Sequence, residues 1–285
     1  MRKPRLTGIY YPAAQTLIDK QLIEAFTSEK GPGDIPVAPS NKKEHVKGII
    51  VPMYPYDLAA PCAGWAYKAL SETNVPDVVI ILGQSKTEDD GFTIDPYETP
   101  YGIVRVDQAL AREIEKKTEL KQRDAIFDED DTIESQLPLL QFVYKQAKTP
   151  LKILPILVSH KTELKKLAVD IKEILMETGK KAAIVVPTNF TSYGRNYNYI
   201  PFSEDAHKKV YELDKEALDL ISANKPLDYL KYADEHMMNT QNYLGITLAL
   251  LILKPKTVLL EQYYTTADLN QDYKNFISFA AVVMK

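Results

Sequence analysis

The stretch VVIILGQSKTEDD, residues 78–90, decides the fold. Its first residues are apolar at consecutive positions, a pattern typical of a strand that is buried on both faces of a sheet. The polar residues 84–87 follow this strand directly. Because α/β proteins bind ligands beyond the carboxyl ends of their strands, the stretch predicts both a central strand and a candidate site at its end.

Further apolar runs rich in Ile and Val show the same pattern. They are VKGIIVP (46–52), LKILPILV (151–158), AAIVVPTNF (182–190), TVLLEQYY (257–264) and the C-terminal ISFAAVVMK (277–285). Helical patterns lie around and between them, at residues 17–26, 60–72, 134–147, 161–179, 203–223 and 240–253. Because strands alternate with helices, we predict an α/β fold with a mostly parallel sheet and helices on both faces. The sequence has neither a repeat nor a long flexible linker, so residues 1–285 are expected to form a single domain.

The composition argues against several classes of protein. The formal net charge of −4 provides no broad basic field for nucleic acid. The single cysteine, Cys62, rules out an intrachain disulfide and fits a reducing compartment. No apolar run reaches the roughly 20 residues of a membrane helix, and the N-terminus lacks the apolar stretch of a signal peptide. We therefore expect a cytoplasmic protein with no nucleic-acid or membrane partner.

Three of the predicted strands end in polar tails. The tails are VPMYPYD (51–57), LGQSKTEDD (82–90) and VPTNFTSYG (186–194). An acidic segment, DEDDTIESQLP (128–138), precedes the strand at 151–158 by one predicted helix. Because the carboxyl ends of parallel strands meet at one edge of a sheet, we expect the four segments to converge on one pocket.

The order of these motifs resembles a known family. The motifs GIYYPA, VPMYPY, ILGQSK, YETPYG, IESQLPLLQ, ILPILV and NFTSYG occur in this order, between Gly8 and the C-terminal SFAAVVM. They resemble the Memo family, which is also called the B proteins of the AmmeMemoRadiSam set. The resemblance implies a fold like that of class III extradiol ring-cleaving dioxygenases. It also implies association with a radical-SAM partner and an AmmeMemo-type partner.

The family pattern has histidines at three strand ends, and this chain has other residues there. The family's V-P-H-A-G-Y motif has Met53 at its histidine position, and L-G-P-S-H-H has Lys86 and Thr87 at its two histidine positions. Transition metals need imidazole, thiolate or carboxylate ligands, and Met and Lys do not replace imidazole.

The remaining family motifs have changed in the same way. The S-D-F-S-H-Y-G motif has Asn189 for its aspartate and Ser192 for its histidine, and E-H-S-L-E is replaced by residues 130–134 without a histidine. The late Cys-Gly pair aligns with Asn239 and Thr240. The four histidines of the chain lie outside these motifs. We therefore expect a degenerate member, a pseudoenzyme that keeps the scaffold but holds no metal and no cofactor.

Lys86 and Glu134 are the two candidate catalytic residues. A lysine at a strand end can bind an anion, or act as a base or nucleophile if burial lowers its pKa. Alternatively, Lys86 forms a structural ion pair with Glu134 or Asp131, which leaves neither charge buried alone. The candidate ligand-binding pocket consists of Met53, Tyr54, Ser85, Lys86, Asp131, Glu134, Asn189, Ser192 and Asn239.

Three functions remain open at this point. The first is a non-catalytic Memo-like protein that binds a protein partner or a small ligand through the vestigial metal site. The second is a metal-independent enzyme in which Lys86 and Glu134 act as acid–base or anion-binding groups and Asn189 orients the substrate. The third is a dioxygenase-like oxidoreductase with an unrecognised metal site, for which Asp130, Asp131 and Glu134 would supply carboxylates. A solvated acidic turn before a helix is the alternative interpretation of that acidic run.

The segment YGRNYNYIPF (193–202) is rich in tyrosine and contains Arg195. Tyr and Arg are typical of contact surfaces. We expect this segment to contact a protein partner or a second copy of the chain, or to form a lid over the pocket.

Overall fold

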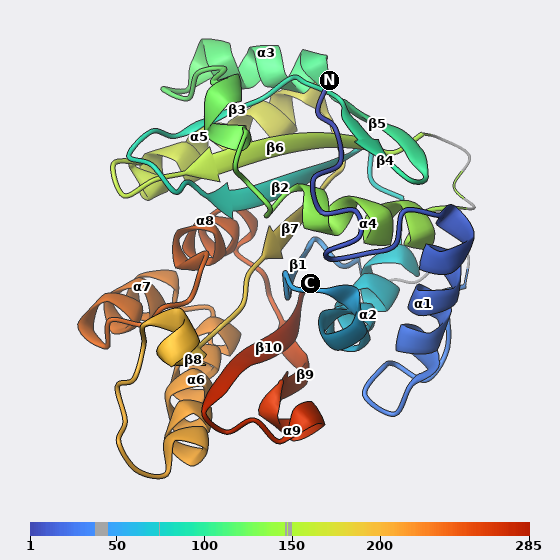
Figure 1. Cartoon of the computed structure of the whole chain (residues 1–285). Helices are drawn as coiled ribbons and strands as arrows, with labels where there is room; N and C mark the ends of the chain where they lie inside the picture. Colours follow the sequence, from blue (N-terminus) through green and yellow to red (C-terminus); the bar gives the residue numbers. More distant parts are fainter. Residues whose placement is uncertain (38–44, 74, 146, 148–149) are drawn as a thin grey trace.

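The computed structural model describes residues 1–37, 45–73, 75–145, 147 and 150–285 (Figure 1). The strands of this part of the chain are β1 (Gly48–Val51), β2 (Val78–Gln84), β3 (Gly91–Phe92), β4 (Tyr97–Thr99), β5 (Gly102–Val106), β6 (Lys152–Val158), β7 (Ala182–Pro187), β8 (Ser192–Gly194), β9 (Val258–Thr265) and β10 (Asn275–Met284). They form one sheet in the order β4-β5-β6-β2-β7-β1-β10-β8, with β3 paired to β6 and β9 paired to β10. Every apolar run predicted to be a strand is confirmed.

The sheet is parallel at its centre and antiparallel towards its edges. The neighbours β5-β6, β6-β2, β2-β7 and β7-β1 all run parallel, whereas β10 is antiparallel to β1, β8 and β9. Residues 78–82 of β2 are fully buried, which explains why that strand is apolar on both faces. In the register of β1 and β7, Val51 lies opposite Pro187, so these two strands end at the same level.

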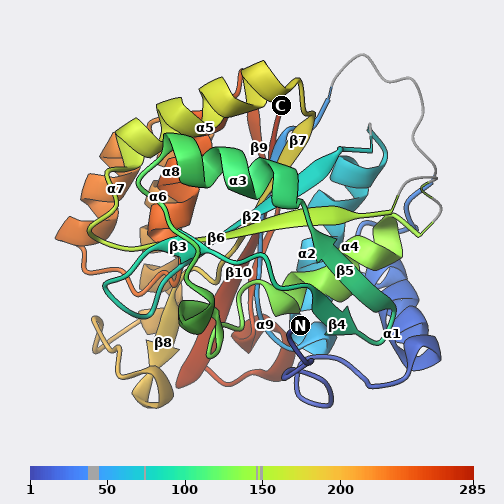
Figure 2. The ribbon, with the colours of Figure 1, turned by 90° about the horizontal axis from the view of Figure 1, so that it is seen from above.

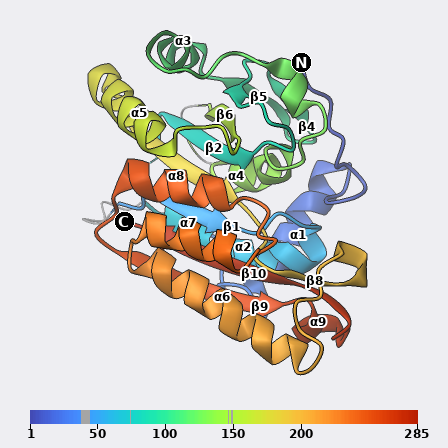
Figure 3. The ribbon, with the colours of Figure 1, turned by 90° about the vertical axis from the view of Figure 1, so that its left-hand side faces the viewer.

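Helices cover both faces of the sheet, as predicted. The α-helices are α1 (Gln15–Thr27), α2 (Tyr56–Ser71), α3 (Gln108–Lys117), α4 (Leu137–Val143), α5 (Leu164–Thr178), α6 (Ala206–Ser222), α7 (Pro226–Glu235), α8 (Tyr243–Leu253) and α9 (Ala267–Asn270), and the short 3₁₀ helices are η1 (Asp124–Phe127), η2 (Glu134–Gln136) and η3 (Arg195–Tyr197). Helix α8 packs on the central strands with α5 and α7 beside it, and α2 packs on the other face with α1 and α4 (Figure 3). Helix α3 lies beside α5 (Figure 2).

The structure divides one predicted helix and confirms the end of another. The helix predicted at 134–147 is a 3₁₀ turn followed by α4, and Pro138 occupies the first turn of α4, where its missing N–H costs nothing. Residue 146 of that prediction lies outside the described residues. Helix α5 ends at Gly179 as expected, because Gly179 adopts a left-handed φ of 64°. Helices α3 and α7 were not predicted.

Burial explains two further features of the helices. Cys62 lies inside α2 and is fully buried, as expected for a small apolar residue. Helix α8 is apolar on nearly all sides because it lies between the sheet and the flanking helices. In the described ranges no helix is both long enough and apolar enough to span a membrane.

Candidate functional site

The carboxyl ends of β1, β2 and β7 meet, as the polar tails predicted. The side chain of Asn242, just before α8, donates to the carbonyls of Leu82 (2.8 Å) and Pro187 (2.9 Å). Gln136 from η2 donates to the carbonyl of Pro52 at 3.3 Å. We call this convergence the strand-end region, which comprises residues 52–54, 82–87, 134–136, 187–192 and 239–242.

Gly83 allows the acidic segment to approach β2 closely. A Cβ at this position would lie 2.5 Å from the Leu157 side chain and 3.2 Å from the Thr132 side chain. A side chain at position 83 would force the buried Leu157 side chain to shift and would press on Thr132. The glycine therefore leaves room for the segment that carries Glu134 beside the end of β2.

Asn189 and Met53 are joined by a two-point clasp. The backbone N–H of Met53 donates to Oδ1 of Asn189 at 3.1 Å, and Nδ2 of Asn189 donates to the Met53 carbonyl at 3.0 Å. The same Nδ2 donates to Oε1 of Gln241 at 3.2 Å. Asn189 is only 1% exposed, so its amide is fully used within the protein.

Asn239 forms a second clasp of the same type with Ser192. The Ser192 N–H donates to Oδ1 of Asn239 at 3.0 Å, and Nδ2 of Asn239 donates to the Ser192 carbonyl at 2.6 Å. The side-chain hydroxyls of Ser192 and Thr240 are buried and have no hydrogen-bond partner within the described residues. Buried polar groups are nearly always paired with protein, water or a ligand. These two hydroxyls are therefore buried polar groups of the strand-end region that a water or a ligand would satisfy.

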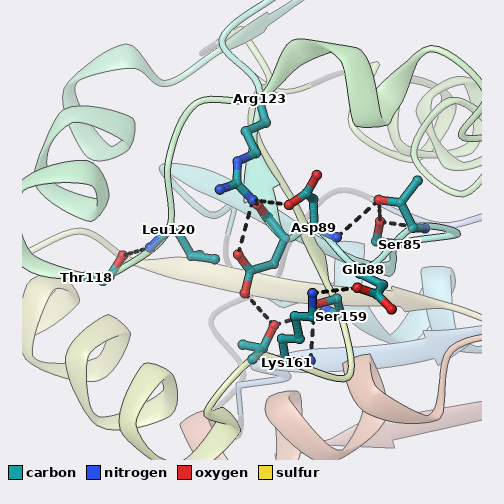
Figure 4. Close-up of polar contacts among 11 residues, drawn as sticks. Ser85, Glu88, Asp89, Thr118, Leu120, Arg123, Ser159 and Lys161 are labelled. Carbon is teal, nitrogen blue, oxygen red and sulfur yellow. Dashed lines mark hydrogen bonds and ion pairs between the residues drawn. The ribbon is translucent and has the colours of Figure 1, made fainter.

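Ser85 and Thr87 fold the loop after β2 onto itself. The Ser85 hydroxyl accepts from the Thr87 N–H at 3.1 Å, and the Thr87 hydroxyl accepts from the Asp89 N–H at 3.2 Å. Arg123 holds the far end of the loop through a 2.9 Å ion pair with Asp89 (Figure 4). Local side chain to backbone bonds of this kind are common in turns, so these residues shape the loop.

Lys86 contacts the acidic segment 128–131. Its Nζ donates to the backbone carbonyl of Glu129 at 2.6 Å and lies 3.9 Å from Oδ2 of Asp131. The side chain is 64% exposed and lines an open cavity of about 340 Å³, together with Asp128, Glu129 and Asp130. Of the two ion pairs considered for Lys86, the structure contains the one with Asp131.

Glu134 anchors the N-terminal segment. Its carboxylate accepts from the N–H groups of Arg5 (2.9 Å) and Leu6 (2.8 Å) and from the Tyr11 hydroxyl (2.6 Å). Glu134 is only 4% exposed. The two candidate catalytic residues therefore contact different segments of the chain. Glu134 binds the N-terminal residues 5–11, and Lys86 binds the acidic segment 128–131.

The acidic run is only partly the solvated turn that we considered. Asp130 is buried, and its Oδ2 accepts from the Ile133 N–H at 3.0 Å, so it fastens the turn before η2. Burial raises the pKa of the Asp130 carboxyl above its usual value, and the hydrogen bonds it accepts offset part of that rise. Asp131 is partly exposed and lies 3.9 Å from the Arg5 guanidinium.

A buried carboxyl group that we did not predict supports the loop after β7. Asp214 of α6 is fully buried and accepts from the hydroxyls of Thr191 (2.6 Å), Tyr263 (2.6 Å) and Ser278. Burial raises the pKa of Asp214, and the three hydroxyl donors counteract the rise. Thr191 lies between Asn189 and Ser192, so Asp214 holds the segment that carries both clasps.

The tyrosine-rich segment 193–202 packs beside the end of β1. Burial and the neighbouring Tyr54 raise the pKa of the Tyr197 phenol, and the Tyr54 ring lies 5.7 Å from that of Phe279. The Tyr193 hydroxyl donates to the Phe202 carbonyl at 2.8 Å, which fastens the segment back onto itself.

The donor set does not fit the metal that the resemblance implies. At the family's histidine positions stand a thioether (Met53), an ammonium bonded to a carbonyl (Lys86) and a lone hydroxyl (Ser192). None of these groups replaces imidazole as a ligand of a divalent transition metal. Within residues 1–37, 45–73, 75–145, 147 and 150–285, no three His, Cys, Asp or Glu side chains come together as potential metal ligands.

A family model described as Memo-like protein matches residues 2–283. The chain belongs to the Memo-like family. The MEMO1 family protein MK0963 of Methanopyrus kandleri is 24% identical to the Memo-like chain over 295 residues, which cover all of this chain and 99% of the relative. A MEMO1 family protein of Ignicoccus hospitalis is 30% identical over 228 residues, covering 76% of this chain and 78% of the relative.

A solved structure confirms the fold of the Memo-like chain. The crystal structure of an uncharacterized protein, JW3007 from Escherichia coli K12, superposes with a TM-score of 0.53. The superposition covers 85% of this chain and 100% of the JW3007 chain, and the sequence identity is 14%. At this identity the likeness concerns the fold alone.

Sequence reasoning missed several residues of the strand-end region of this Memo-like protein. Gln84 accepts from the Leu244 N–H at 3.3 Å, and Asn242 accepts from the Gly245 N–H at 3.1 Å, so both amides cap the start of α8. Asn242 before the apolar run 243–253 carries the usual N-cap signal and could have been found from it. The roles of Gln136 and Gln241 depend on distant contacts that carry no local signal.

Proposed function

We propose that this Memo-like protein is a non-catalytic binding protein that takes a small ligand or a protein partner at its strand-end region. The observation that carries the proposal is the Asn189–Met53 clasp. The resembled pattern has an aspartate and a cysteine at the positions of Asn189 and Asn239. The amides of these two residues bind the backbone groups of Met53 and Ser192. Ser192, at a third such position, offers only a hydroxyl.

The binding role is supported by the Ser192 and Thr240 hydroxyls, which are buried without a partner in the described part of the chain. Each is a neutral donor and acceptor, so the ligand type that suits them is polar and uncharged. Tyr54 and the nearby Tyr197 are partly exposed at the same edge and give a protein partner aromatic surface to contact. The radical-SAM and AmmeMemo-type proteins implied by the resemblance are the first partners to test.

Metal analysis of the purified protein tests the non-catalytic part. Protein produced in medium supplemented with iron, copper and zinc is expected to contain far less than one metal ion per chain by mass spectrometry. An Asn189→Asp, Ser192→His double variant, which restores two of the resembled ligands, is the comparison. One equivalent of metal in the wild-type protein that is lost on changing Ser192 to Ala would overturn the proposal.

Native mass spectrometry of gently purified protein tests the binding part. A co-purifying small molecule or protein is expected on the wild type, with reduced occupancy on Ser192→Ala. The exposed Ser203→Ala variant is the matched control, since Ser203 lies outside the strand-end region. Equal occupancy on all three proteins would place the binding elsewhere.

A metal-independent enzyme is the second candidate, and one observation favours it. Lys86 lines an open cavity of about 340 Å³, where its ammonium can meet an anionic group. Glu134, however, is occupied by Arg5, Leu6 and Tyr11, so the acid–base pair with Lys86 requires the N-terminal segment to leave. Turnover that depends on Lys86 and increases on loosening this segment would support this candidate.

A further inference from the structure

Helix α5 has an exposed strip opposite the side that it buries against the rest of the protein. The α5 strip consists of Val169, Lys172, Glu173 and Met176. These residues are spaced at i, i+3, i+4 and i+7, so they share one face of the helix. All four line a groove of about 320 Å³ between α5 and α8. The structure describes every residue of both helices.

The two ends of the α5 strip are apolar. Val169 is 54% exposed and Met176 is 73% exposed. Leu251 of α8 is partly exposed and lines the same groove. Apolar side chains that gather at a concave surface mark an interaction site, whereas single exposed ones need no explanation. The strip therefore offers apolar contact at both ends, with two charged residues between them.

The two charges of the α5 strip have opposite signs, and both side chains are exposed. Within the described part of the chain, neither Lys172 nor Glu173 forms an ion pair. Charges elsewhere on this helix do have partners, since Lys166 pairs with Glu119. Neighbouring residues on a helix do not face each other, so Lys172 and Glu173 do not satisfy one another. The strip thus presents a cation and an anion that are both available to another molecule.

The order of its residues makes the α5 strip complementary to itself. Two copies of α5 can pack antiparallel about a two-fold axis that passes between residues 172 and 173. Val169 then lies level with Met176 of the second copy, and Lys172 lies level with Glu173 of the second copy. The symmetry makes each contact twice, as in other isologous interfaces. Lys165 continues the same face beyond this contact, where packed helices diverge because they cross at an angle.

We propose that the α5 strip is a self-association surface, through which two copies of the chain pair antiparallel about a two-fold axis. The surface shares no residue with the strand-end region and goes beyond the function proposed above. The strip balances one Lys with one Glu and lacks the cluster of basic residues that an anionic membrane attracts. Because each copy contributes little more than one helix face, the contact belongs to the small, transient class of interfaces.

Sedimentation equilibrium of the full chain tests this proposal. The wild type is expected to dimerise with a dissociation constant on the order of 100 µM. Lys172→Glu and Glu173→Lys each place like charges opposite one another, twice in every dimer. Each variant should therefore dimerise roughly 10-fold more weakly than the wild type, or worse. A wild type that stays monomeric up to about 1 mM would overturn the proposal.

Mixing the two single variants tests the antiparallel arrangement itself. One copy then has two acidic residues at positions 172 and 173, and the other has two basic ones. Both pairs across the axis again have opposite signs, so the mixture should form heterodimers about as tightly as the wild type dimerises. Misfolding of either variant cannot produce this rescue. The double variant Lys172→Glu, Glu173→Lys exchanges the two charges and should also dimerise like the wild type.

Lys208→Glu is the matched control for the change in net charge. Lys208 is 79% exposed on α6, which α7 and α8 separate from α5 (Figure 3). This variant should dimerise like the wild type. The proposal is wrong if the single variants dimerise as well as the wild type or if their mixture stays monomeric. It is also wrong if Lys208→Glu weakens the dimer as much as Lys172→Glu does.

Discussion

The side-chain amide of Asn189 pairs with both backbone groups of Met53, at 3.1 Å and 3.0 Å. The two residues are 136 positions apart in the sequence, and the clasp joins the segments that follow β7 and β1. The Asn239–Ser192 clasp repeats the arrangement between the segment before α8 and β8. Neutral amides therefore hold together the edge of the sheet where the resembled family pattern has histidines.

Replacing Asn189 by Asp should destabilise the protein. The new carboxylate keeps the acceptor for the Met53 N–H but presents a second oxygen to the Met53 carbonyl and to Gln241. At pH 7 we expect a loss of about 1–3 kcal/mol in the free energy of unfolding, measured by urea denaturation.

The loss should shrink as the pH falls to about 4, since a protonated Asp can donate to the Met53 carbonyl. Burial and carbonyl neighbours raise the folded-state pKa of the new group, so its favourable form is present at low pH and is lost as the pH rises. The exposed Asn196→Asp variant is the control. A similar small effect of both changes would show that the clasp does not contribute to stability.

Glu134→Gln should loosen the N-terminal segment. The carboxylate accepts three hydrogen bonds, and an amide would turn one NH₂ group towards donors. We expect a loss of about 1–3 kcal/mol in unfolding free energy, with faster hydrogen exchange at Arg5 and Leu6. The exposed Glu129→Gln variant should change neither quantity. Unchanged exchange at Arg5 and Leu6 in Glu134→Gln would contradict the anchoring role.

Asp214 should make stability depend on pH. Burial raises its folded pKa, so the folded state holds this proton more strongly than the unfolded chain does. Its favourable contribution is complete below the unfolded pKa of about 3.9 and is lost as the pH rises through the folded pKa. As the pH rises through the folded pKa, the free energy of unfolding of the wild type should therefore fall relative to that of Asp214→Asn. The expected fall is about 1.4 kcal/mol for each unit by which the folded pKa is raised.

Urea denaturation at several pH values between 4 and 8 measures this difference. Asp57→Asn, at an exposed position in α2, serves as the matched control. Parallel stability curves for the wild type and Asp214→Asn would show that the buried carboxyl does not titrate differently in the folded state.

Lys86→Ala should change stability little. The side chain is 64% exposed and its ion pair with Asp131 spans 3.9 Å, a geometry that contributes little in water. We expect a shift within about 0.5 kcal/mol in urea denaturation. Asp131→Ala should behave in the same way. A loss well above 1 kcal/mol for Lys86→Ala alone would show that this lysine compensates a buried charge.

The sequence predicts the sheet better than the contacts at its edge. Residues 78–82 are apolar on both faces, and this pattern is local, so the central strands could be located from it. Short strands such as β4 and β8 have no such pattern because they are held by pairing with distant partners. Helix α3 had a signal, since Asp107 caps it by accepting from the Leu110 N–H, and we did not use it.

The sequence predicted that the polar strand ends converge, but not the contacts that they make there. The resemblance located Met53, Asn189 and Ser192 near one another in the fold, and the clasps join them to their neighbours. The anchoring of Glu134 could not be foreseen, because its three donors lie in residues 5–11, more than 120 positions away. Asp214 was missed because a carboxylate on an amphipathic helix normally faces solvent.

The amides of Asn189, Asn239 and Asn242 also bear on how the protein matures in a cell. An amide neither ionises in the physiological range nor exchanges its partners for dissolved ions. The contacts that these three amides make can therefore form during folding itself, from groups that the chain already carries. These hydrogen bonds do not depend on the supply of iron, and a chelator does not remove them.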